Sequence, residues 1–175
     1  MSLSSIWNCR IRLTVLVLLG MCAVILTALG FQHIGGYIPC KLCYEQREPW
    51  YVGIPVVAFA LFAMLAKWPN CLSRGLMAIA GTLMLYSLVL AIHHSGVEWQ
   101  WWAGPTDCAV VVDGLSDTTA GNLLDQLDSV KAPSCDEAAG RFLGLSFAGW
   151  NAIASLALAV LAIRAAMLVP QNANS

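Results

Sequence analysis

Four long runs of the sequence contain no charged side chain, at residues 13–31, 49–66, 75–92 and 142–163. A hydrocarbon core about 30 Å thick needs about 20 helical residues, and each run approaches that length. The pattern therefore predicts an all-α membrane protein, a bundle of four transmembrane helices in one domain. The composition agrees, because 59% of the residues are apolar, 11% are charged and the mean hydropathy is +0.71. No water-soluble domain of this size needs so much apolar surface.

The charged residues are divided between the two sides of the predicted bundle. All ten acidic residues lie in the segments 32–48 and 93–141. Basic residues near membrane ends are retained on the cytoplasmic side. Five basic residues mark that side: Arg10, Arg12, Lys67, Arg74 and Arg164. We therefore expect both termini to be cytoplasmic and the segments 32–48 and 93–141 to be outer loops.

A cleaved signal peptide is an alternative interpretation of the first run. Ala28-Leu29-Gly30 has the small residues of a cleavage site. The apolar run before it is longer than the 7 to 15 residues typical of a signal peptide, however. We therefore expect the run to remain as the first transmembrane helix.

The seven cysteines sort by compartment. Thiols on the cytoplasmic side stay reduced, and a cysteine inside a span behaves as a small apolar residue. Three are therefore expected to be inert: Cys9, Cys22 and Cys71. Four lie in the predicted outer loops: Cys40, Cys43, Cys108 and Cys135. An even set on an oxidising side can form two disulfides, with Cys40 paired to Cys43 and Cys108 paired to Cys135 as the expected arrangement.

The two predicted bonds differ in what they can do. A bond between Cys40 and Cys43 constrains almost no chain, whereas such pairs recur where a thiolate must form and leave readily. This favours redox chemistry, although a zinc site stays open, with His33 as the closest third ligand. A bond between Cys108 and Cys135 would stabilise the fold by roughly 3.5 kcal/mol, so a structural role stays open for that pair.

Arg47 strengthens the redox interpretation. Cys43 lies just before the second run, near the positive end of a helix dipole, and such a position lowers a thiol pKa. Arg47 follows four residues later and would share a helical face with Cys43. Its guanidinium can stabilise a thiolate or donate hydrogen bonds to an anionic oxygen on a bound acceptor. The alternative is an interfacial anchor that extends to lipid headgroups.

Taken in order, several motifs resemble the disulfide bond formation protein B (DsbB) family, from about residue 31 to residue 163. They are Pro39-Cys40-Lys41-Leu42-Cys43, Arg47, Cys108, Cys135, Leu143-Gly144-Leu145-Ser146 and Trp150-Asn151. The resemblance implies a protein dithiol:quinone oxidoreductase of the bacterial inner membrane. Such an enzyme reoxidises a soluble, periplasmic, thioredoxin-like dithiol oxidase of the DsbA type and passes the electrons to ubiquinone or menaquinone, which sustains disulfide bond formation.

The resemblance also implies a role for each residue of the motifs. Cys108 would form the mixed disulfide with the partner oxidase and exchange together with Cys135. A transient bond between Cys40 and Cys135 would carry the oxidation from one pair to the other. Cys43 would contact the quinone, and Arg47 would bind a quinone oxygen.

Two histidines, His93 and His94, follow the third run. The resemblance places a histidine close to the quinone, with His94 as the better positional match. A group with a pKa near 6.5 is suited to supplying a proton to a quinone oxygen. The alternative is a pair of interfacial histidines in an aromatic belt with Trp99, Trp101 and Trp102. Glu98 is expected to be solvated.

The long outer loop has one further pattern. Its apolar residues at helical spacing are Leu123, Leu124, Leu127 and Val130. They predict a short amphipathic helix within residues 119–130, which would rest on the membrane surface or pack against the bundle.

Other classes of function are less consistent with the sequence. Nothing resembles a glycine-rich phosphate loop, and we expect no metal, flavin, nucleotide or nucleic-acid partner, only membrane lipid, a quinone and the DsbA-type oxidase. A thiol-quinone reductase like vitamin K epoxide reductase would have its redox pair near the end of the last helix, where no such pair exists. A non-catalytic membrane scaffold or metal-handling protein with structural outer disulfides is the other alternative.

Overall fold

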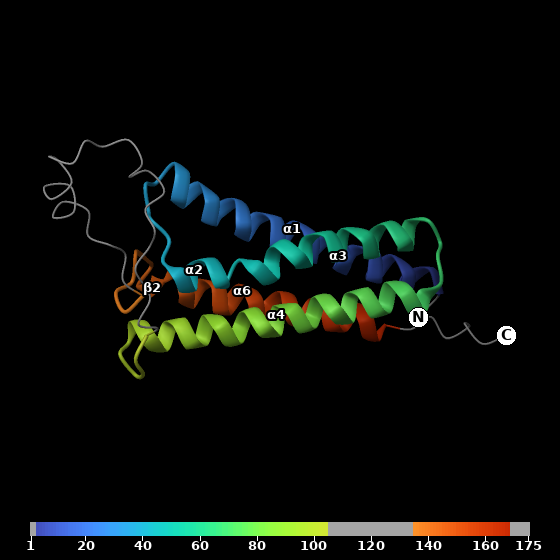
Figure 1. Ribbon diagram of the computed structural model, residues 1–175. Helices are drawn as coiled ribbons and strands as arrows, with labels where there is room; N and C mark the ends of the chain where they lie inside the picture. The colour runs from blue at the N-terminus through green and yellow to red at the C-terminus, as the bar shows by residue number, and fades with distance from the viewer. Residues whose placement is uncertain (1–2, 105–134, 169–175) are drawn as a thin grey trace, which may run out of the picture.

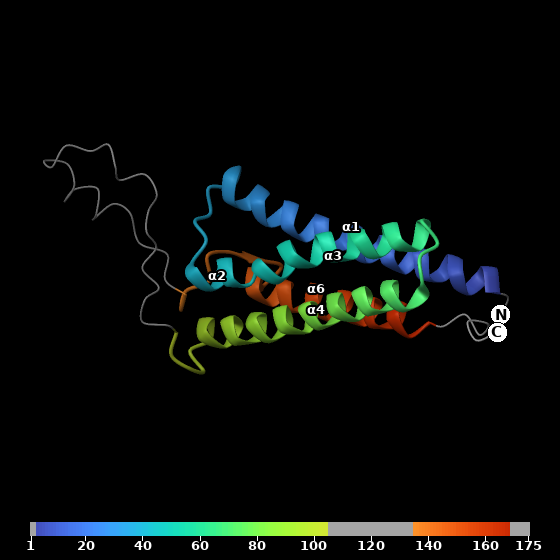
Figure 2. The same cartoon turned by 45° about the vertical axis from the view of Figure 1, so that its right-hand side comes forward.

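The computed structural model describes residues 3–104 and 135–168. Its elements are α1 (Leu3–His33), α2 (Lys41–Glu45), α3 (Glu48–Leu65), α4 (Asn70–Glu98), β1 (Arg141–Phe142), β2 (Leu145–Ser146) and α6 (Phe147–Met167). Figures 1 and 2 show α1, α3, α4 and α6 running side by side as a bundle. In the described part of the chain, four helical segments are long and apolar enough to cross a membrane: Ser5–His33, Lys41–Leu65, Asn70–Glu98 and Phe147–Met167. The predicted four-helix membrane bundle is confirmed.

The outer surface of the bundle is apolar. Its exposed side chains include Leu19, Leu26, Phe62, Leu65, Val89 and Ile153. So large an apolar surface is unfavourable in water and matches the hydrocarbon interior of a membrane, where helices satisfy their own backbone hydrogen bonds. The bundle therefore presents its sides to lipid.

The core that joins the four long helices contains methionines, small residues and hydrogen-bonded polar side chains. The fully buried methionines are Met21, Met64, Met77 and Met84. Ser87 of α4 accepts a hydrogen bond from the Trp50 indole of α3 at 2.9 Å and lies 3.0 Å from the Ser155 hydroxyl of α6. Interhelical hydrogen bonds of this kind fix the register of helices inside a membrane.

A short hairpin precedes the last helix, which begins at Phe147 rather than at residue 142. Leu143 and Gly144 have positive φ values of 51° and 82°, a turn that reverses the chain in two residues. Phe142 therefore pairs with Leu145. Ser146 then ends the hairpin, and its hydroxyl accepts the Gly149 N–H at the start of α6.

At one end of the bundle, here called the cysteine end, α1 and α4 finish while α2, α3 and α6 begin. The opposite end carries the five basic residues that marked the predicted cytoplasmic side. One of them, Arg10, is fully buried and joins three helices. It donates to the Ala165 carbonyl at 3.3 Å, to Asn70 at 3.1 Å and to Ser73 at 3.0 Å. Arg10 thus supplies a partner to a carbonyl in the last turn of α6.

Replacing Arg10 by Leu should destabilise the bundle by about 2–4 kcal/mol, because buried acceptors on α4 and α6 would lose a charged donor. Thermal unfolding of the detergent-solubilised protein measures the change. The matched control is Arg12→Leu, because Arg12 is exposed on the same helix. Equal unfolding temperatures for the two variants would contradict the structural role of Arg10.

Candidate functional site

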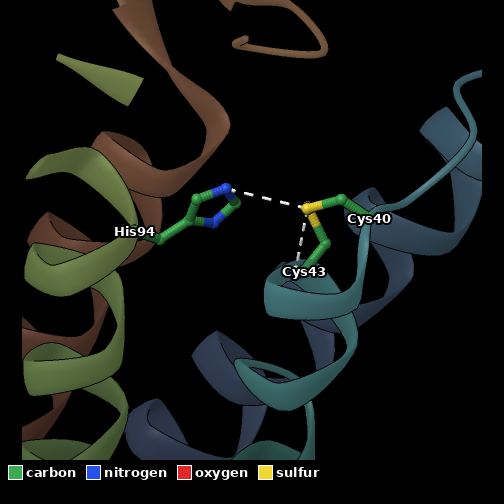
Figure 3. A group of neighbouring side chains, drawn as sticks. All are labelled: Cys40, Cys43 and His94. Carbon is green, nitrogen blue, oxygen red and sulfur yellow. Dashed lines mark hydrogen bonds between the residues drawn. The ribbon is translucent and has the colours of Figure 1, made fainter. Parts of the chain in front are cut away.

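The two cysteines of the Cys40–Cys43 pair lie at the cysteine end, around the start of α2. Cys40 is the N-cap residue of α2, and its sulfur accepts the backbone N–H of Cys43 at 3.4 Å. The two sulfur atoms are 2.9 Å apart, and both thiols are free. Figure 3 shows both sulfurs directed toward His94 of α4. The pair is therefore in its dithiol form, with the sulfurs adjacent.

The pKa of Cys40 is lowered. The hydrogen bond from the Cys43 thiol is the largest cause, burial opposes it, and a hydrogen bond with His94 acts in the same direction as Cys43. The sequence suggested Cys43 for this role, on the assumption that Cys43 lay nearest the helix N-terminus. In the structure Cys40 is the N-cap, so it is the Cys40 sulfur that meets a helix N–H.

The ultraviolet thiolate absorbance of the dithiol form should persist on acidification. With the pKa of Cys40 lowered to about 4, its thiolate still predominates at about pH 5, where a simple thiol of pKa about 8.5 is protonated. The signal is the difference between the wild type and Cys40→Ala, titrated anaerobically in detergent. A difference signal that disappears between about pH 9 and pH 8 would contradict the lowered pKa.

The two neighbouring histidines have separate environments. His94 is 3% exposed, and its Nε2 lies 3.7 Å from the Cys40 sulfur. His93 is exposed, and its ring stacks on Trp102 with centroids 5.8 Å apart. This separation arises because α4 continues to Glu98, which turns His94 toward the bundle and His93 toward the aromatic cluster.

The side chain of Glu98 is buried, so the expectation that it is solvated was wrong. Its side chain is 4% exposed, and Oε1 lies 3.8 Å from His94 Nε2. Its other oxygen, Oε2, is buried without a hydrogen-bond partner among the described residues. Glu98 is one helical turn after His94, so both side chains share the inward face of α4.

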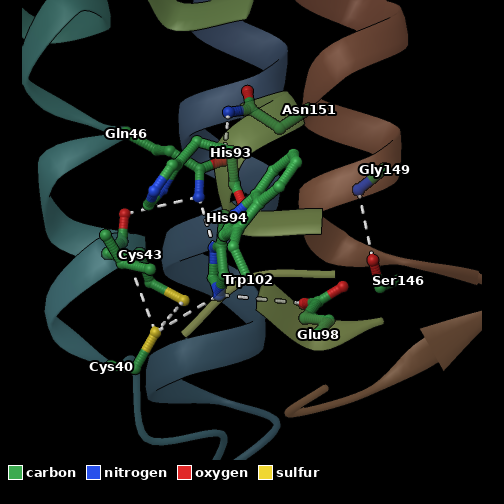
Figure 4. Close-up of polar contacts among 11 residues, drawn as sticks. Cys40, Cys43, Gln46, His93, His94, Glu98, Trp102, Ser146, Gly149 and Asn151 are labelled. Carbon is green, nitrogen blue, oxygen red and sulfur yellow. Dashed lines mark hydrogen bonds and ion pairs between the residues drawn. The ribbon is translucent and has the colours of Figure 1, made fainter. Parts of the chain in front are cut away.

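Two amide side chains complete the site, and the sequence analysis assigned them no role. Gln46 is buried, donates to the Leu42 carbonyl at 3.3 Å and contacts His94 Nδ1. Asn151 of α6 donates to Gln46 Oε1 at 2.7 Å. Figure 4 shows Gln46 between Asn151 and His94. The sequence feature that could have identified Gln46 is its position three residues after Cys43 and directly before Arg47.

Arg47 is the N-cap residue of α3, and α2 ends before it at Glu45. Cys43 and Arg47 therefore belong to different helices rather than to one helical face. The guanidinium of Arg47 donates to Gln32 Oε1 of α1 and lies 5.5 Å from the ring centroid of Tyr44. These two contacts hold the charged group in place.

A cavity of about 560 Å³ connects these groups. It opens between α1, α3, α4 and α6 at the cysteine end, and its lining is mostly apolar, including Phe31, Cys43, Arg47, Trp50, His94 and Phe147. Cavities of roughly 300–1,000 Å³ with apolar walls and a few polar groups are typical of small-molecule and cofactor sites. The polar groups of its wall include the guanidinium of Arg47 and the thiol of Cys43.

The second predicted cysteine pair is described only in part. Cys135 is 1% exposed and disulfide-bonded, and it belongs to one buried cluster with Cys40, Leu42 and Val97. Cys108 and the predicted helix at 119–130 lie outside the described residues. The pairing of Cys108 with Cys135 stays a prediction, as does the transient bond between Cys40 and Cys135, although the structure brings Cys40 and Cys135 into the same cluster.

The same geometry contains a possible metal-ligand group. One ligand atom each from Cys40, Cys43 and His94 lies within 4.8 Å of the others. Two thiolates and an imidazole are ligands that zinc accepts. His94 takes the place that the sequence suggested for His33, which is exposed at the end of α1. Among the described residues this group offers three ligands, one fewer than a closed structural zinc site needs.

Comparison with known proteins gives one family. The family model described as "Disulfide bond formation protein DsbB" matches residues 10–165. Disulfide bond formation protein B of Polaromonas sp. is 29% identical over 154 residues, which cover 85% of this chain and 87% of the relative. Disulfide bond formation protein B of Saccharophagus degradans is 29% identical over 161 residues, 87% of this chain and 90% of the relative.

A third relative, Disulfide bond formation protein B 2 of Pseudomonas entomophila, is 26% identical over 151 residues, 82% of this chain and 83% of the relative. No solved structure matches the chain. The family match covers most of the chain, including the cysteine pair at the start of α2 and all four long helices except the first residues of α1 and the last of α6. The chain therefore belongs to the DsbB family of membrane proteins that act in disulfide bond formation.

Proposed function

We propose that this protein reoxidises a soluble thioredoxin-like dithiol oxidase of the DsbA type and passes the electrons to ubiquinone or menaquinone. The main observation that supports this proposal is that Cys43, Arg47 and His94 line one apolar cavity directly beside Cys40. A dithiol, a fixed cation and an imidazole around an apolar pocket supply what two-electron reduction of a quinone needs. Membership of the DsbB family supports the proposal.

The cysteines carry the electrons in two stages. The partner dithiol exchanges with the disulfide between Cys108 and Cys135, so the partner is oxidised and the outer pair is reduced. Cys135 then attacks the Cys40–Cys43 disulfide, which forms a transient bond between Cys40 and Cys135 and releases Cys43 as a thiol; attack by Cys108 on this bond restores the outer disulfide and releases Cys40 as a thiol. When Cys40 and Cys43 next form their own disulfide, they release two electrons and two protons, which a bound quinone accepts.

The side chains around the cavity prepare this transfer. Cys40 stays available as a thiolate because Cys43 and His94 donate to its sulfur. The guanidinium of Arg47 donates to an oxygen of the acceptor and stabilises negative charge there. The apolar walls formed by Phe31, Trp50 and Phe147 keep water from the reacting groups.

The protein would act in the bacterial inner membrane, with the cysteine end toward the periplasm and both termini in the cytoplasm. The support is the position of the basic residues at the far end of the bundle. Cys71, exposed at the start of α4, is a probe of this orientation. A membrane-impermeant maleimide should label Cys71 only after the inner membrane is permeabilised, and labelling in intact spheroplasts would contradict the orientation.

Anaerobic quinone reduction by the purified protein tests the function. The electron donor is a reduced thioredoxin-like periplasmic oxidase, and Cys40→Ala is the control. We expect quinol to form at the same rate as the partner disulfide, and only with the wild type. Absence of turnover with reducible disulfides would overturn the proposal.

The group formed by Cys40, Cys43 and His94 is the observation that favours the metal-handling alternative. That function requires zinc to copurify with the reduced protein at about one equivalent and to be lost in Cys40→Ala. Metal content measured on the same preparation as quinone reduction separates the two functions. Zinc-free protein that reduces quinone excludes the alternative.

A further inference from the structure

A chain of amide side chains reaches the imidazole of His94 from the side opposite Cys40 (Figure 4). Asn151 of α6 donates to Gln46 Oε1 at 2.7 Å. Gln46 Nε2 in turn lies 3.3 Å from the Leu42 carbonyl oxygen and contacts His94 Nδ1. His94 Nε2 faces the Cys40 sulfur. The chain therefore extends from α6 through the junction of α2 and α3 to the cysteine pair.

The Leu42 carbonyl determines which way the Gln46 amide points. A backbone carbonyl can only accept hydrogen bonds, so the Gln46 atom that faces it must be the NH₂ group. The amide oxygen then faces Asn151, whose NH₂ donates to it. One hydrogen of the Gln46 NH₂ group points to Leu42, and the other is available to His94 Nδ1.

Because Gln46 donates to it, Nδ1 of His94 must be an acceptor. A neutral imidazole with an unprotonated Nδ1 carries its proton on Nε2. The groups that face Nε2 agree with this assignment, because both are acceptors: the sulfur of Cys40 at 3.7 Å and Oε1 of Glu98 at 3.8 Å. Every hydrogen-bonding position on the ring is then matched.

We propose that Gln46 and Asn151 are positioning residues that hold neutral His94 in its Nε2-protonated tautomer, so that the ring donates a hydrogen bond to the Cys40 sulfur. This inference deepens the proposed function and rests on it. A donor at Nε2 stabilises Cys40 as a thiolate each time a bond to that sulfur breaks. In this state Nε2 cannot accept the Cys40 proton, so His94 is a hydrogen-bond donor to the thiolate rather than its base.

Nuclear magnetic resonance of the dithiol form in detergent micelles tests the tautomer directly. The protein is labelled with ¹⁵N only at its three histidines, and the signals of His94 are those missing in His94→Gln. At about pH 8, where an ordinary histidine is neutral, we expect His94 to give the signals of the Nε2-protonated form. Signals of the Nδ1-protonated form in the wild type would overturn the inference.

Two substitutions of Gln46 are expected to change the His94 tautomer in different ways. Gln46→Glu replaces the donor by a carboxylate that only accepts, so the proton should move to Nδ1. Gln46→Leu removes the contact, so the tautomers should mix. In Gln46→Glu the neutral ring no longer donates to the sulfur, so the pH at which the Cys40 thiolate absorbance is lost should rise by about one unit relative to the wild type. An unchanged tautomer in Gln46→Glu would overturn the assignment.

Two further variants separate positioning from folding. Asn151→Leu removes the donor to the Gln46 amide oxygen without changing Gln46 itself and should also mix the tautomers, which keeps the test available if Gln46 variants fold poorly. Gln32→Leu is the matched control, because Gln32 is a cavity amide that contacts Arg47 and not His94. It should leave the His94 signals unchanged, and a shift as large as that of Gln46→Leu would contradict a specific role for Gln46.

The assignment of the His94 tautomer and the proposed function can be contradicted independently of each other. An Nδ1-protonated His94 in a protein that reduces quinone would remove the inference and leave the function. An Nε2-protonated His94 in a protein that never reduces quinone would remove the function, while the assignment of Gln46 and Asn151 as positioning residues toward Cys40 would remain.

Discussion

Cys43→Ser is expected to abolish quinone reduction, with a loss of at least about 10³-fold. Cys43 is the sulfur of the inner pair that lines the cavity, and without it Cys40 has no neighbour 2.9 Å away with which to form a disulfide. The outer disulfide can still exchange once with the partner. The expected result is therefore one equivalent of oxidised partner per protein and no quinol.

Cys22→Ser is the matched control for this experiment. Cys22 is half-buried in α1 and lies outside the site, so the same change of sulfur to oxygen should leave turnover within about twofold. Partner oxidation is followed by electrophoresis after thiol trapping, and quinol formation by absorbance. Quinol formation by Cys43→Ser above a tenth of the wild-type rate would show that Cys43 does not pass electrons to the quinone.

The transmembrane helices were predictable because crossing a membrane is a local property of the chain. A segment without charges and about 20 residues long is sufficient evidence for a helix in lipid, where no other open structure satisfies its backbone. Their ends were less predictable. The hairpin before α6 requires Leu143 to adopt a positive φ, which is uncommon for leucine. A turn at this position was therefore not expected, and the apolar residues from 142 onward were predicted to begin the helix.

In the candidate site, too, the residues that are close together in the sequence were easier to predict than the contacts between distant segments. Cys40, Cys43 and Arg47 lie within eight residues and could be proposed from their spacing, and the structure places His94 beside Cys40. Their individual roles stay predictions. The contact between His94 and Cys40 joins residues 54 positions apart, so it depends on how α4 packs against α2.

Polar residues buried at the cysteine end were the hardest to predict. Gln46 and Glu98 both flank apolar runs, where a polar residue usually meets water or lipid headgroups. In the structure the interior at this end holds a small group of polar side chains, in which Gln46 contacts His94 and Glu98 lies beside the same ring. Only the tertiary arrangement of α2, α4 and α6 distinguishes these residues from ordinary interfacial ones.

Arg47→Met is expected to raise the KM for quinone by about 10–100-fold, the range for a lost hydrogen bond from a charged donor. The guanidinium lies in the cavity wall, where Gln32 accepts from it and the Tyr44 ring packs against it. Because these contacts fix the planar group, Arg47→Lys should restore the charge without the geometry and recover only part of the affinity. With saturating quinone the kcat should change less than the KM.

The measurement is the initial rate of quinol formation over a range of quinone concentrations, with reduced partner oxidase in excess. Arg141→Met is the matched control, because Arg141 is an exposed arginine in β1 at the same end of the bundle and is not part of the cavity wall. It removes the same charge from the cysteine end without touching the proposed pocket. If Arg47→Met reduced quinone as well as the wild type at low quinone concentration, the acceptor would have to bind elsewhere, and the cavity beside Cys43 would lose its proposed role.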